Sequence, residues 1–199
     1  MPVAAFKGKI VVVDNKKSLF KALQLLEKEK MVGFDTETRP SFEKGTRHKV
    51  SLMQIATDKV CFLFRLHELN GIPKELETFL NSTDCKKIGL SLRDDFHLLN
   101  RHKKLNRDSF IDLQSIIRDY GIQELSLKKM FAILFNRKIS KSQRLTNWEN
   151  KELSDAQKRY AATDAWAVLK IYERISTMKK SENKSEKQTN LPTDIPVFL

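Results

Sequence analysis

The sequence has little of what marks a secreted or membrane-embedded protein. Its two cysteines, Cys61 and Cys85, are isolated, which excludes a disulfide framework and is typical of buried thiols in a cytoplasmic protein. Its apolar runs fall far short of the roughly 20 residues that span a bilayer. Lys7 and Lys9 interrupt the first apolar stretch, which therefore lacks the core of a signal peptide. We expect a cytoplasmic protein with no membrane segment.

Acidic residues are scarce relative to basic ones, and the imbalance lies in the part expected to fold. The chain has 37 Lys and Arg against 25 Asp and Glu, a formal net charge of +12. Residues 176–199 carry four Lys and three acidic residues, so +11 of this charge lies on residues 1–175. An excess of this sign favours a polyanionic partner such as nucleic acid, although many basic proteins bind none.

The length and composition predict one folded domain followed by a polar tail. With 199 residues, 40% of them hydrophobic, the chain is long enough for a sizeable core. Beyond Met178 the sequence is mostly Lys, Ser, Glu, Asn and Gln, which cannot bury enough apolar surface to fold. We therefore expect a domain at residues 1–178 and a disordered tail at 179–199, although residues 191–199 regain some apolar character and could dock.

The spacing of apolar residues predicts alternating strands and helices, which is typical of an α/β domain with a mixed sheet. Strands are expected at residues 10–13 (an edge strand), 32–35, 50–56, 60–64, 86–90 and 110–111, with 50–56 and 60–64 as a hairpin. Helices are expected from 19 to about 30, at 74–80, around Phe96 and Leu99, at 113–120, at 126–135 and from 155 to about 175.

The expected helix ends follow from capping residues. They are Ser18 and Asp112 as N-caps, Pro73 in a first turn, Ser154 with Gln157 as a capping box, and Gly121 as a stop. Residues 39–49 and 136–150 are polar and are expected to be loops, the second one mobile.

A pair of carboxylates ends the expected strand at residues 32–35. Asp35 and Glu37 are two residues apart, so an extended backbone directs both to one side of the sheet. Carboxylates this close repel each other, and a divalent cation such as Mg²⁺ or Mn²⁺ would neutralise them. The alternative is an exposed acidic turn after a strand.

Two further acidic positions lie on later elements. Asp94 and Asp95 follow the expected strand at 86–90, where acidic residues also serve as helix caps. Tyr160 and Asp164 are four residues apart on the long helix, which places both on one helical face. Each pair alone is common on protein surfaces. Acidic groups on three elements are nevertheless what phosphodiester hydrolysis by two metal ions requires.

In this order and with their flanking residues, the motifs resemble the DEDD 3′–5′ exonucleases of the tyrosine subclass, the group of ribonuclease D and the Werner exonuclease domain. The first motif matches at residues 33–38, the second from 87–89 to Asp95, and the third from Tyr160 to Asp164. Residues 39–40 and 50–56 resemble the Werner-like branch. Arg159 stands where the histidine subclass has its histidine, which favours the tyrosine subclass. The resemblance spans residues 10–175.

The resemblance implies a ribonuclease H-like fold, a mixed β-sheet flanked by helices, and a 3′–5′ exonuclease domain with two divalent metal ions, Mg²⁺ or Mn²⁺. Its products would be nucleoside monophosphates, released from single-stranded 3′ ends of DNA or RNA. The metal ligands carried over are Asp35, Glu37, Asp95 and Asp164, with Asp35 bridging the two ions. Tyr160 would help Glu37 to position the attacking water.

The second motif contains two adjacent acids, either of which could be the metal ligand. In the family motif the glycine lies six residues before the acid, so Gly89 favours Asp95 over Asp94 as the ligand. Asp94 is then expected to cap the helix.

Substrate contacts are expected from Thr36, Lys141 and Arg144, the last two in a basic loop that could instead be a solvated surface.

Other residues carry weaker signals. The histidines, His48, His67, His97 and His102, have no metal-ligand spacing and are expected on the surface or in packing. Trp148 either stacks on a base or, more simply, anchors the polar loop before the long helix. The alternative to an exonuclease is a non-catalytic nucleic-acid-binding module of the same fold, against which stands the presence of all four acids and Tyr160.

Overall fold

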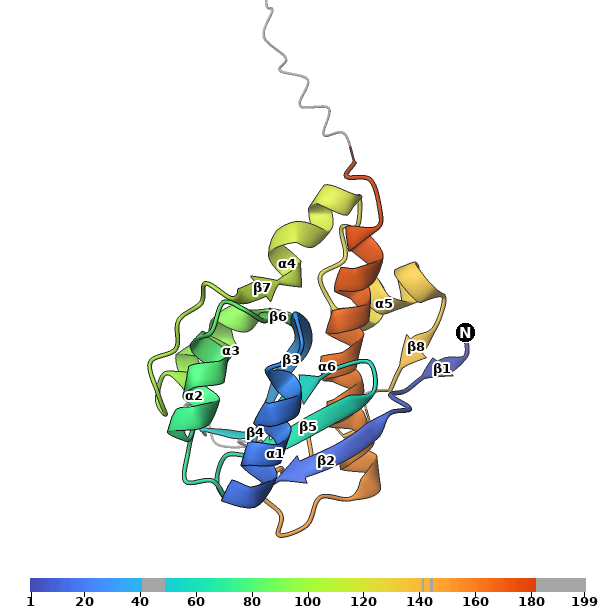
Figure 1. The fold of residues 1–199 in the computed structure, drawn as a ribbon. Helices are drawn as coiled ribbons and strands as arrows, with labels where there is room; N and C mark the ends of the chain where they lie inside the picture. The colour runs from blue at the N-terminus through green and yellow to red at the C-terminus, as the bar shows by residue number, and fades with distance from the viewer. Residues whose placement is uncertain (41–48, 141, 144, 182–199) are drawn as a thin grey trace, which may run out of the picture.

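A computed structural model shows a six-stranded mixed sheet with helices on both faces (Figure 1). The structure describes residues 1–40, 49–140, 142–143 and 145–181. The strands are ordered β2-β5-β4-β3-β6-β7 across the sheet. Their bounds are β2 (Lys9–Val13), β3 (Met31–Thr38), β4 (Val50–Ala56), β5 (Val60–Arg65), β6 (Lys86–Gly89) and β7 (Phe110–Asp112). β4 is antiparallel to β3 and β5, while the pairs β2–β5, β3–β6 and β6–β7 are parallel.

The helices cover the two faces of this sheet in two groups. One hydrophobic cluster joins the sheet to α1 (Lys16–Leu26), α2 (Lys74–Asn81) and α3 (Leu92–Leu99). A second joins it to α4 (Leu113–Ile116), the 3-10 helix η1 (Ile117–Tyr120), α5 (Leu127–Phe135) and α6 (Asp155–Ser176). In Figure 1, α6 is the long orange-red helix that crosses the sheet. The mixed sheet, its β2 edge strand and the β4–β5 hairpin confirm the sequence-based expectations.

β4 and β5 are mostly apolar because both of their faces are covered. Every residue of β4 is buried, as are the last five of β5. A strand that is buried on both faces shows a continuous apolar run rather than alternation. β4 pairs directly with β3, which carries the first acidic motif, and so fixes its position in the sheet.

Several helix boundaries differ from those expected. α1 begins after Asn15, whose side chain accepts from Ser18 N (3.0 Å), so Asn15 and not Ser18 is the N-cap. Ser18 completes a capping box, because its hydroxyl oxygen accepts from Asn15 N (3.3 Å). α1 ends at Leu26 rather than near Lys30. The residues at 27–30 are all polar, and β3 begins directly after them. Pro73 is the N-cap of α2 rather than a residue of its first turn.

The segment at 136–150, expected to be a mobile loop, is partly ordered by distant partners. β8 (Lys138–Ile139) pairs in parallel with β1 (Val3–Ala4) in a second, two-stranded sheet. Trp148 is fully buried. The expectation was wrong for these residues because the partner strand lies more than 130 residues away, beyond the reach of local patterns.

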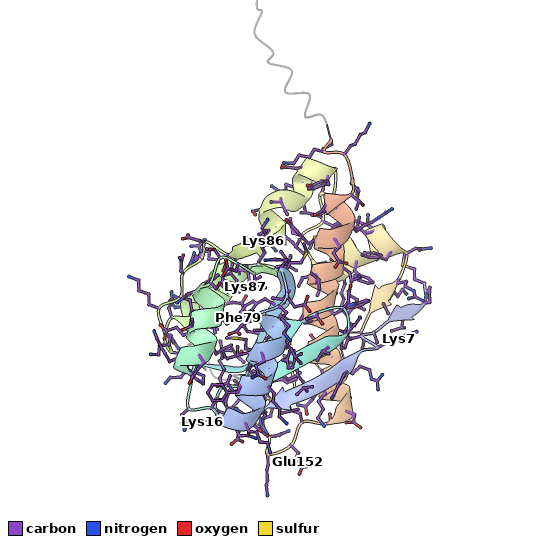
Figure 2. All side chains as sticks on the ribbon, viewed as in Figure 1. Lys7, Lys16, Phe79, Lys86, Lys87 and Glu152 are labelled. Atoms are coloured by element: carbon purple, nitrogen blue, oxygen red, sulfur yellow. The ribbon has the colours of Figure 1, made fainter. Side chains whose placement is uncertain are left out.

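A buried lysine ties β6 to the neighbouring elements. Lys87 is fully buried, and its Nζ donates hydrogen bonds to Ser82 O (2.6 Å) and Ser109 Oγ (3.3 Å). Its Nζ also lies 4.7 Å from the Phe79 ring centroid, a cation–π distance (Figure 2). Burial lowers the pKa of Lys87 to about 8. These contacts fix the strand that leads into Gly89 and α3.

Both cysteines are free and buried, as expected. None of the helices in the described part of the chain is long and apolar enough to cross a membrane. Lys180 and Ser181, which we assigned to the tail, contact Asp119, the lysine through an ion pair of 2.9 Å. The loop at 41–48, Lys141, Arg144, His48 and the remaining tail at 182–199 lie outside the described residues. The domain boundary and the cytoplasmic location stay predictions.

Candidate active site

Strand β3 carries the first two acids on one side of the sheet. It runs from Met31 to Thr38, longer than the strand expected from its apolar residues alone. Asp35 and Glu37 alternate with Thr36 along it, so both side chains project from the same face. A register shift between Glu37 and Thr38 ends the regular pairing with β4 just after the second acid. The acids therefore lie in the C-terminal half of the strand, next to this irregularity.

Helix α6 brings the third acid to this point by packing its backbone onto β3. A Cβ on Gly33 would lie 1.8 Å from Ala165 O, so only glycine allows so close a contact. Ala161, Ala162 and Ala165, the small residues around Asp164, are fully buried. The close approach of helix and strand places Asp164 opposite Asp35.

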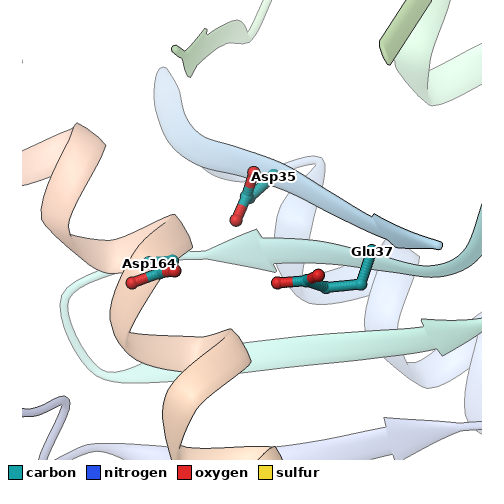
Figure 3. A group of neighbouring side chains, drawn as sticks. All are labelled: Asp35, Glu37 and Asp164. Atoms are coloured by element: carbon teal, nitrogen blue, oxygen red, sulfur yellow. The ribbon is translucent and has the colours of Figure 1, made fainter. Parts of the chain in front are cut away.

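The three carboxylates form one group (Figure 3). One carboxylate oxygen from each of Asp35, Glu37 and Asp164 lies within 4.8 Å of the other two. In Figure 3, Asp35 and Glu37 extend from β3 toward Asp164 on α6. The structure thus brings together three of the four carboxylates that the sequence assigned to metal binding.

Burial and mutual repulsion oppose ionisation of this group. Burial, followed by the charges of Glu37, Asp164 and Asp95, raises the pKa of Asp35 well above its usual value. Burial raises the pKa of Asp164 to about 6, against the opposing effects of Tyr160 and Lys128. The charges of the three other acids all act on Asp35, as expected for a carboxylate at the centre of the set.

The donor set fits a divalent cation. Asp164 Oδ1 is buried and has no hydrogen-bond partner among the described residues. Buried polar atoms without partners are rare and need an explanation. A hard cation with carboxylate ligands supplies one, because it would bind this oxygen and remove the repulsion between the three acids.

Asp95 lies beside this group rather than within it. Its carboxylate accepts a hydrogen bond from the Thr36 hydroxyl, one residue after Asp35. Burial raises the pKa of Asp95 to about 6, although the Thr36 hydrogen bond opposes the shift. Its neighbour Asp94 is exposed on the outer face of α3. The structure therefore directs Asp95, and not Asp94, toward the acidic group.

The expectation that Asp94 caps α3 was wrong. The N-cap is Ser91, in a left-handed conformation (φ 57°) and without a side-chain capping bond. The Asp112 carboxylate from β7 caps the helix instead, accepting from Ser91 N (2.9 Å) and Leu92 N (2.8 Å). The same carboxylate accepts from Gln114 N (2.9 Å) and caps α4, as the sequence predicted. The cap that Asp112 provides to α3 depends on β6 and β7 lying side by side. Nothing in the sequence near α3 therefore predicts it.

Tyr160 lies between the acidic group and the hydrophobic core. Burial, and then the charge of Asp164, raises the pKa of its hydroxyl, which interacts with the Asp164 carboxylate. The Trp148 ring lies 6.0 Å from the Tyr160 ring, centroid to centroid. Because Trp148 is fully buried, it packs behind Tyr160 and is not free to stack on a base.

A cavity of about 610 Å³ opens beside the acids. Asp35 and Asp164 line one side of it, and the other lining residues are Leu90, Gln114, Leu125, Ser126, Leu127 and Lys128. The sequence-based prediction gave none of these six a role in the site. They come from three separate segments, and only the packing of α4 and α5 against the sheet brings them together.

Comparison with known proteins agrees with this geometry. A family model described as "3'-5' exonuclease" matches residues 10–180. The chain is 30% identical over 175 residues to the Mus musculus "Bifunctional 3'-5' exonuclease/ATP-dependent helicase WRN", covering 83% of this chain and 12% of that protein. It is 31% identical over 149 residues to the Drosophila melanogaster "Exonuclease 3'-5' domain-containing protein 2", covering 73% of this chain and 25% of that protein. The chain thus spans a quarter or less of both relatives.

Solved structures share the fold. The Nibbler EXO domain of Aedes aegypti superimposes with a TM-score of 0.77 at 23% identity, covering 87% of this chain and 91% of that one. Trypanosoma brucei RNase D, solved in complex with RNA U12, gives a TM-score of 0.77 at 19% identity, covering 87% and 64%. Because the family model matches most of the sequence, this chain belongs to the DEDD 3′–5′ exonuclease family of enzymes, of the Werner exonuclease type.

Proposed function

We propose that this chain is a metal-dependent exonuclease that hydrolyses the last phosphodiester bond at the 3′ end of a single strand and releases a nucleoside monophosphate. The observation that supports this most directly is the meeting of Asp35, Glu37 and Asp164 within 4.8 Å. A surface patch of acids gains nothing from bringing three carboxylates so close together. A site for cations, and through them for a phosphate, requires it.

The four acids would hold two divalent cations, Mg²⁺ or Mn²⁺. Asp35, Glu37 and Asp164 would bind one ion, and Asp35 and Asp95 the other. Such a pair activates water for attack and stabilises the leaving oxygen at phosphorus. The central position of Asp35 supports its bridging role, because the charges of the three other carboxylates all act on it.

Glu37 and Tyr160 would orient the attacking water. The raised pKa of Tyr160 keeps its hydroxyl protonated at neutral pH, so the hydroxyl acts as a hydrogen-bond donor and not as a base. Glu37, at the end of β3, offers a carboxylate oxygen that accepts a hydrogen bond from the water. Trp148 fixes the tyrosine ring from behind.

The proposed substrate is DNA or RNA. Hydrolysis takes place at phosphate, which the two polymers share, and a net charge of +12 suits either. Trypanosoma brucei RNase D has been solved with RNA, and the relative in Mus musculus is named as an exonuclease and helicase. Substrate contacts from Thr36, Lys141 and Arg144 stay predictions.

The alternative, a non-catalytic module that binds nucleic acid, is less well supported. Binding alone needs positive charge and stacking surfaces. It gives no reason to gather three half-buried carboxylates together or to hold Asp95 beside them through Thr36.

The direct test is a time course on a 5′-labelled single strand, as DNA and as RNA, with Mg²⁺, Mn²⁺ or EDTA. We expect a ladder shortened one nucleotide at a time from the 3′ end, no products in EDTA, and none with Asp35→Asn. Asp94→Asn is the matched control, since Asp94 is acidic, near the site and exposed. Binding without any cleavage by the wild type in either metal would favour the alternative.

A further inference from the structure

The segment at residues 146–151, which we call the brace, precedes α6 and is held from two sides. These residues, all of them described, form no helix or strand, yet Trp148 among them is fully buried. Backbone groups outside regular structure need other hydrogen-bond partners. In the brace, side chains of β4, β5 and α6 supply them.

The sheet holds the brace through β4 and β5. The Ser51 hydroxyl on β4 donates a hydrogen bond to a Glu149 carboxylate oxygen (2.9 Å). Arg65, the last residue of β5, donates from Nη1 to Lys151 O (2.7 Å) and from Nη2 to Asn150 O. Ser51 and Arg65 are both buried, so water competes little for these donors.

Helix α6 holds the brace through one glutamine. Gln157, in the first turn of α6, is buried, and its Nε2 donates to Asn147 O (3.1 Å) and Thr146 Oγ1 (3.1 Å). Its Oε1 accepts from Ser154 N (2.9 Å) in the capping box of α6. The two ends of this amide thus have separate roles, because the oxygen caps the helix and the nitrogen binds the brace.

These contacts set Trp148 against Tyr160. Trp148 follows Asn147 directly, and its ring centroid lies 6.0 Å from that of Tyr160. Tyr160 is three residues after Gln157, so both lie on the helical face that the brace crosses. A helical tyrosine has more than one allowed χ1 rotamer. Packing against a ring that is itself fixed limits Tyr160 to one of them.

We propose that the brace positions the Tyr160 hydroxyl relative to Glu37. Gln157 and Ser51 are then positioning residues, which act on the attacking water through Tyr160. The inference rests on the proposed exonuclease function, in which Glu37 and Tyr160 together orient that water. Leu52, the residue after Ser51, is the register partner of Glu37, so the brace joins α6 to the part of the sheet that carries this acid.

Gln157→Glu separates the two roles of the glutamine. Glutamate also serves in capping boxes, so the cap of α6 is kept while both donors to the brace are lost. We expect kcat to fall about tenfold or more with KM within about twofold, because displacing an oriented group by about 1 Å can lower a rate about 10²-fold. Ser51→Ala, which removes the anchor on β4, should change kcat and KM in the same way.

Ser109→Ala is the control for a simple loss of stability. Ser109 is also buried, and its hydroxyl donates to Leu80 O (3.2 Å) beside β7, at the opposite edge of the sheet from β2. This variant should lower the melting temperature and leave kcat within about twofold of the wild-type value.

The decisive experiment repeats both changes in a Tyr160→Phe background. Single-turnover rates with excess enzyme measure these slow variants. If Gln157 and Ser51 act through the Tyr160 hydroxyl, neither Gln157→Glu nor Ser51→Ala should lower the rate by more than about twofold further once that hydroxyl is absent.

A second measurement follows the brace without catalysis. The chain has two tryptophans, Trp148 and Trp166, so Trp166→Phe leaves Trp148 as the sole fluorescent reporter. In that protein, Gln157→Glu should shift the Trp148 emission to longer wavelength and increase its quenching by acrylamide, because a loosened brace exposes the ring to water. Ser51→Ala should do the same.

An equal fall in rate with and without the Tyr160 hydroxyl would overturn the inference, as would an unchanged kcat in a variant whose Trp148 emission has shifted. Unshifted emission in both Gln157→Glu and Ser51→Ala would also overturn it, since the brace would not depend on these anchors. So would an equal fall in kcat for Ser109→Ala. A wild type that never shortens a strand would instead contradict the proposed function, and the fluorescence would still decide whether these anchors hold Trp148 against Tyr160.

Discussion

The Thr36 hydroxyl donates a hydrogen bond to the Asp95 carboxylate and joins β3 to the first turn of α3. The two residues are 59 positions apart in the sequence, yet Thr36 adjoins Asp35. We expected Thr36 to contact substrate, and in the structure its hydroxyl orients a carboxylate. This hydrogen bond holds Asp95 near Asp35. Because Thr36 is neutral, it adds no negative charge between the two carboxylates.

Replacing Thr36 by valine should therefore impair catalysis more than stability. Thr36→Val keeps the side-chain shape and removes the donor, so Asp95 loses its orientation. We expect kcat to fall about 5–30-fold, from a lost hydrogen bond of roughly 1–2 kcal/mol to a charged group. Thr36→Ser, which keeps the hydroxyl, should stay near wild type in the same single-strand assay. Equal rates for the valine and serine variants would show that the hydrogen bond has no role in turnover.

Asp95 and Asp94 should behave differently when each is changed to asparagine. Asp95→Asn should abolish hydrolysis with little change in melting temperature, because it removes a proposed metal ligand. Asp94→Asn should retain activity, since Asp94 is exposed on the other side of α3. The reverse pattern would move the second motif by one residue and leave the rest of the site intact.

Stability at this corner should depend on Asp112 and not on Asp94. The Asp112 carboxylate accepts from three backbone N–H groups and caps two helices. Asp112→Ala should lower the free energy of unfolding by about 1–4 kcal/mol in urea titrations, since it removes two caps that each contribute roughly 0.5–2 kcal/mol. Asp94→Ala should change it by less than about 0.5 kcal/mol. A larger loss for Asp94→Ala than for Asp112→Ala would restore Asp94 as the cap.

Tyr160→Phe should separate catalysis from metal binding. The phenylalanine ring keeps the packing against Trp148 and loses the hydroxyl that would orient the water. We expect kcat to fall roughly 10²–10⁴-fold, the usual contribution of a positioned proton-handling group. Calorimetric titration with Mn²⁺ should give nearly the wild-type affinity. A parallel loss of affinity and rate would assign Tyr160 to the metal site instead.

The metal-free protein should become less stable as pH rises. Asp95 and Asp164 have pKa values of about 6 when folded, against 3.8 ordinarily, so the folded state binds more protons than the unfolded state between these values. In EDTA, the melting temperature should therefore decline between about pH 4 and pH 6 relative to that of an Asp95→Asn/Asp164→Asn variant. At pH 7.5, Mn²⁺ should raise the melting temperature of the wild type and not of Asp35→Asn. A melting-temperature difference between the wild type and this double variant that stays constant from pH 4 to pH 6 would contradict the raised pKa values.

The chemistry of the site was predictable where it depends on local geometry. Strand alternation placed Asp35 and Glu37 on one face, and helical spacing placed Tyr160 and Asp164 on another. That these faces meet came only from the family resemblance, because no local pattern specifies which elements pack together. The sequence therefore predicted the acids of the site and the mixed sheet that carries them.

What the sequence missed depends on contacts between distant segments. The pairing of β1 with β8, the cap that Asp112 provides to α3 and the orientation of the Thr36 hydroxyl all join residues at least 20 positions apart. Trp148 had two interpretations because burial cannot be read from one tryptophan after a polar loop. The cavity that contains Lys128 was not predicted for the same reason, since three segments form it.

The contact of Gly33 with Ala165 has a consequence for how far the sequence can vary. The separation between Asp35 and Asp164 is set by one backbone lying against another, not by the size of intervening side chains. Surrounding residues can then be exchanged widely while the two carboxylates keep their spacing. Gly33 itself is the exception, because any side chain there would push the helix and its carboxylate away from the strand.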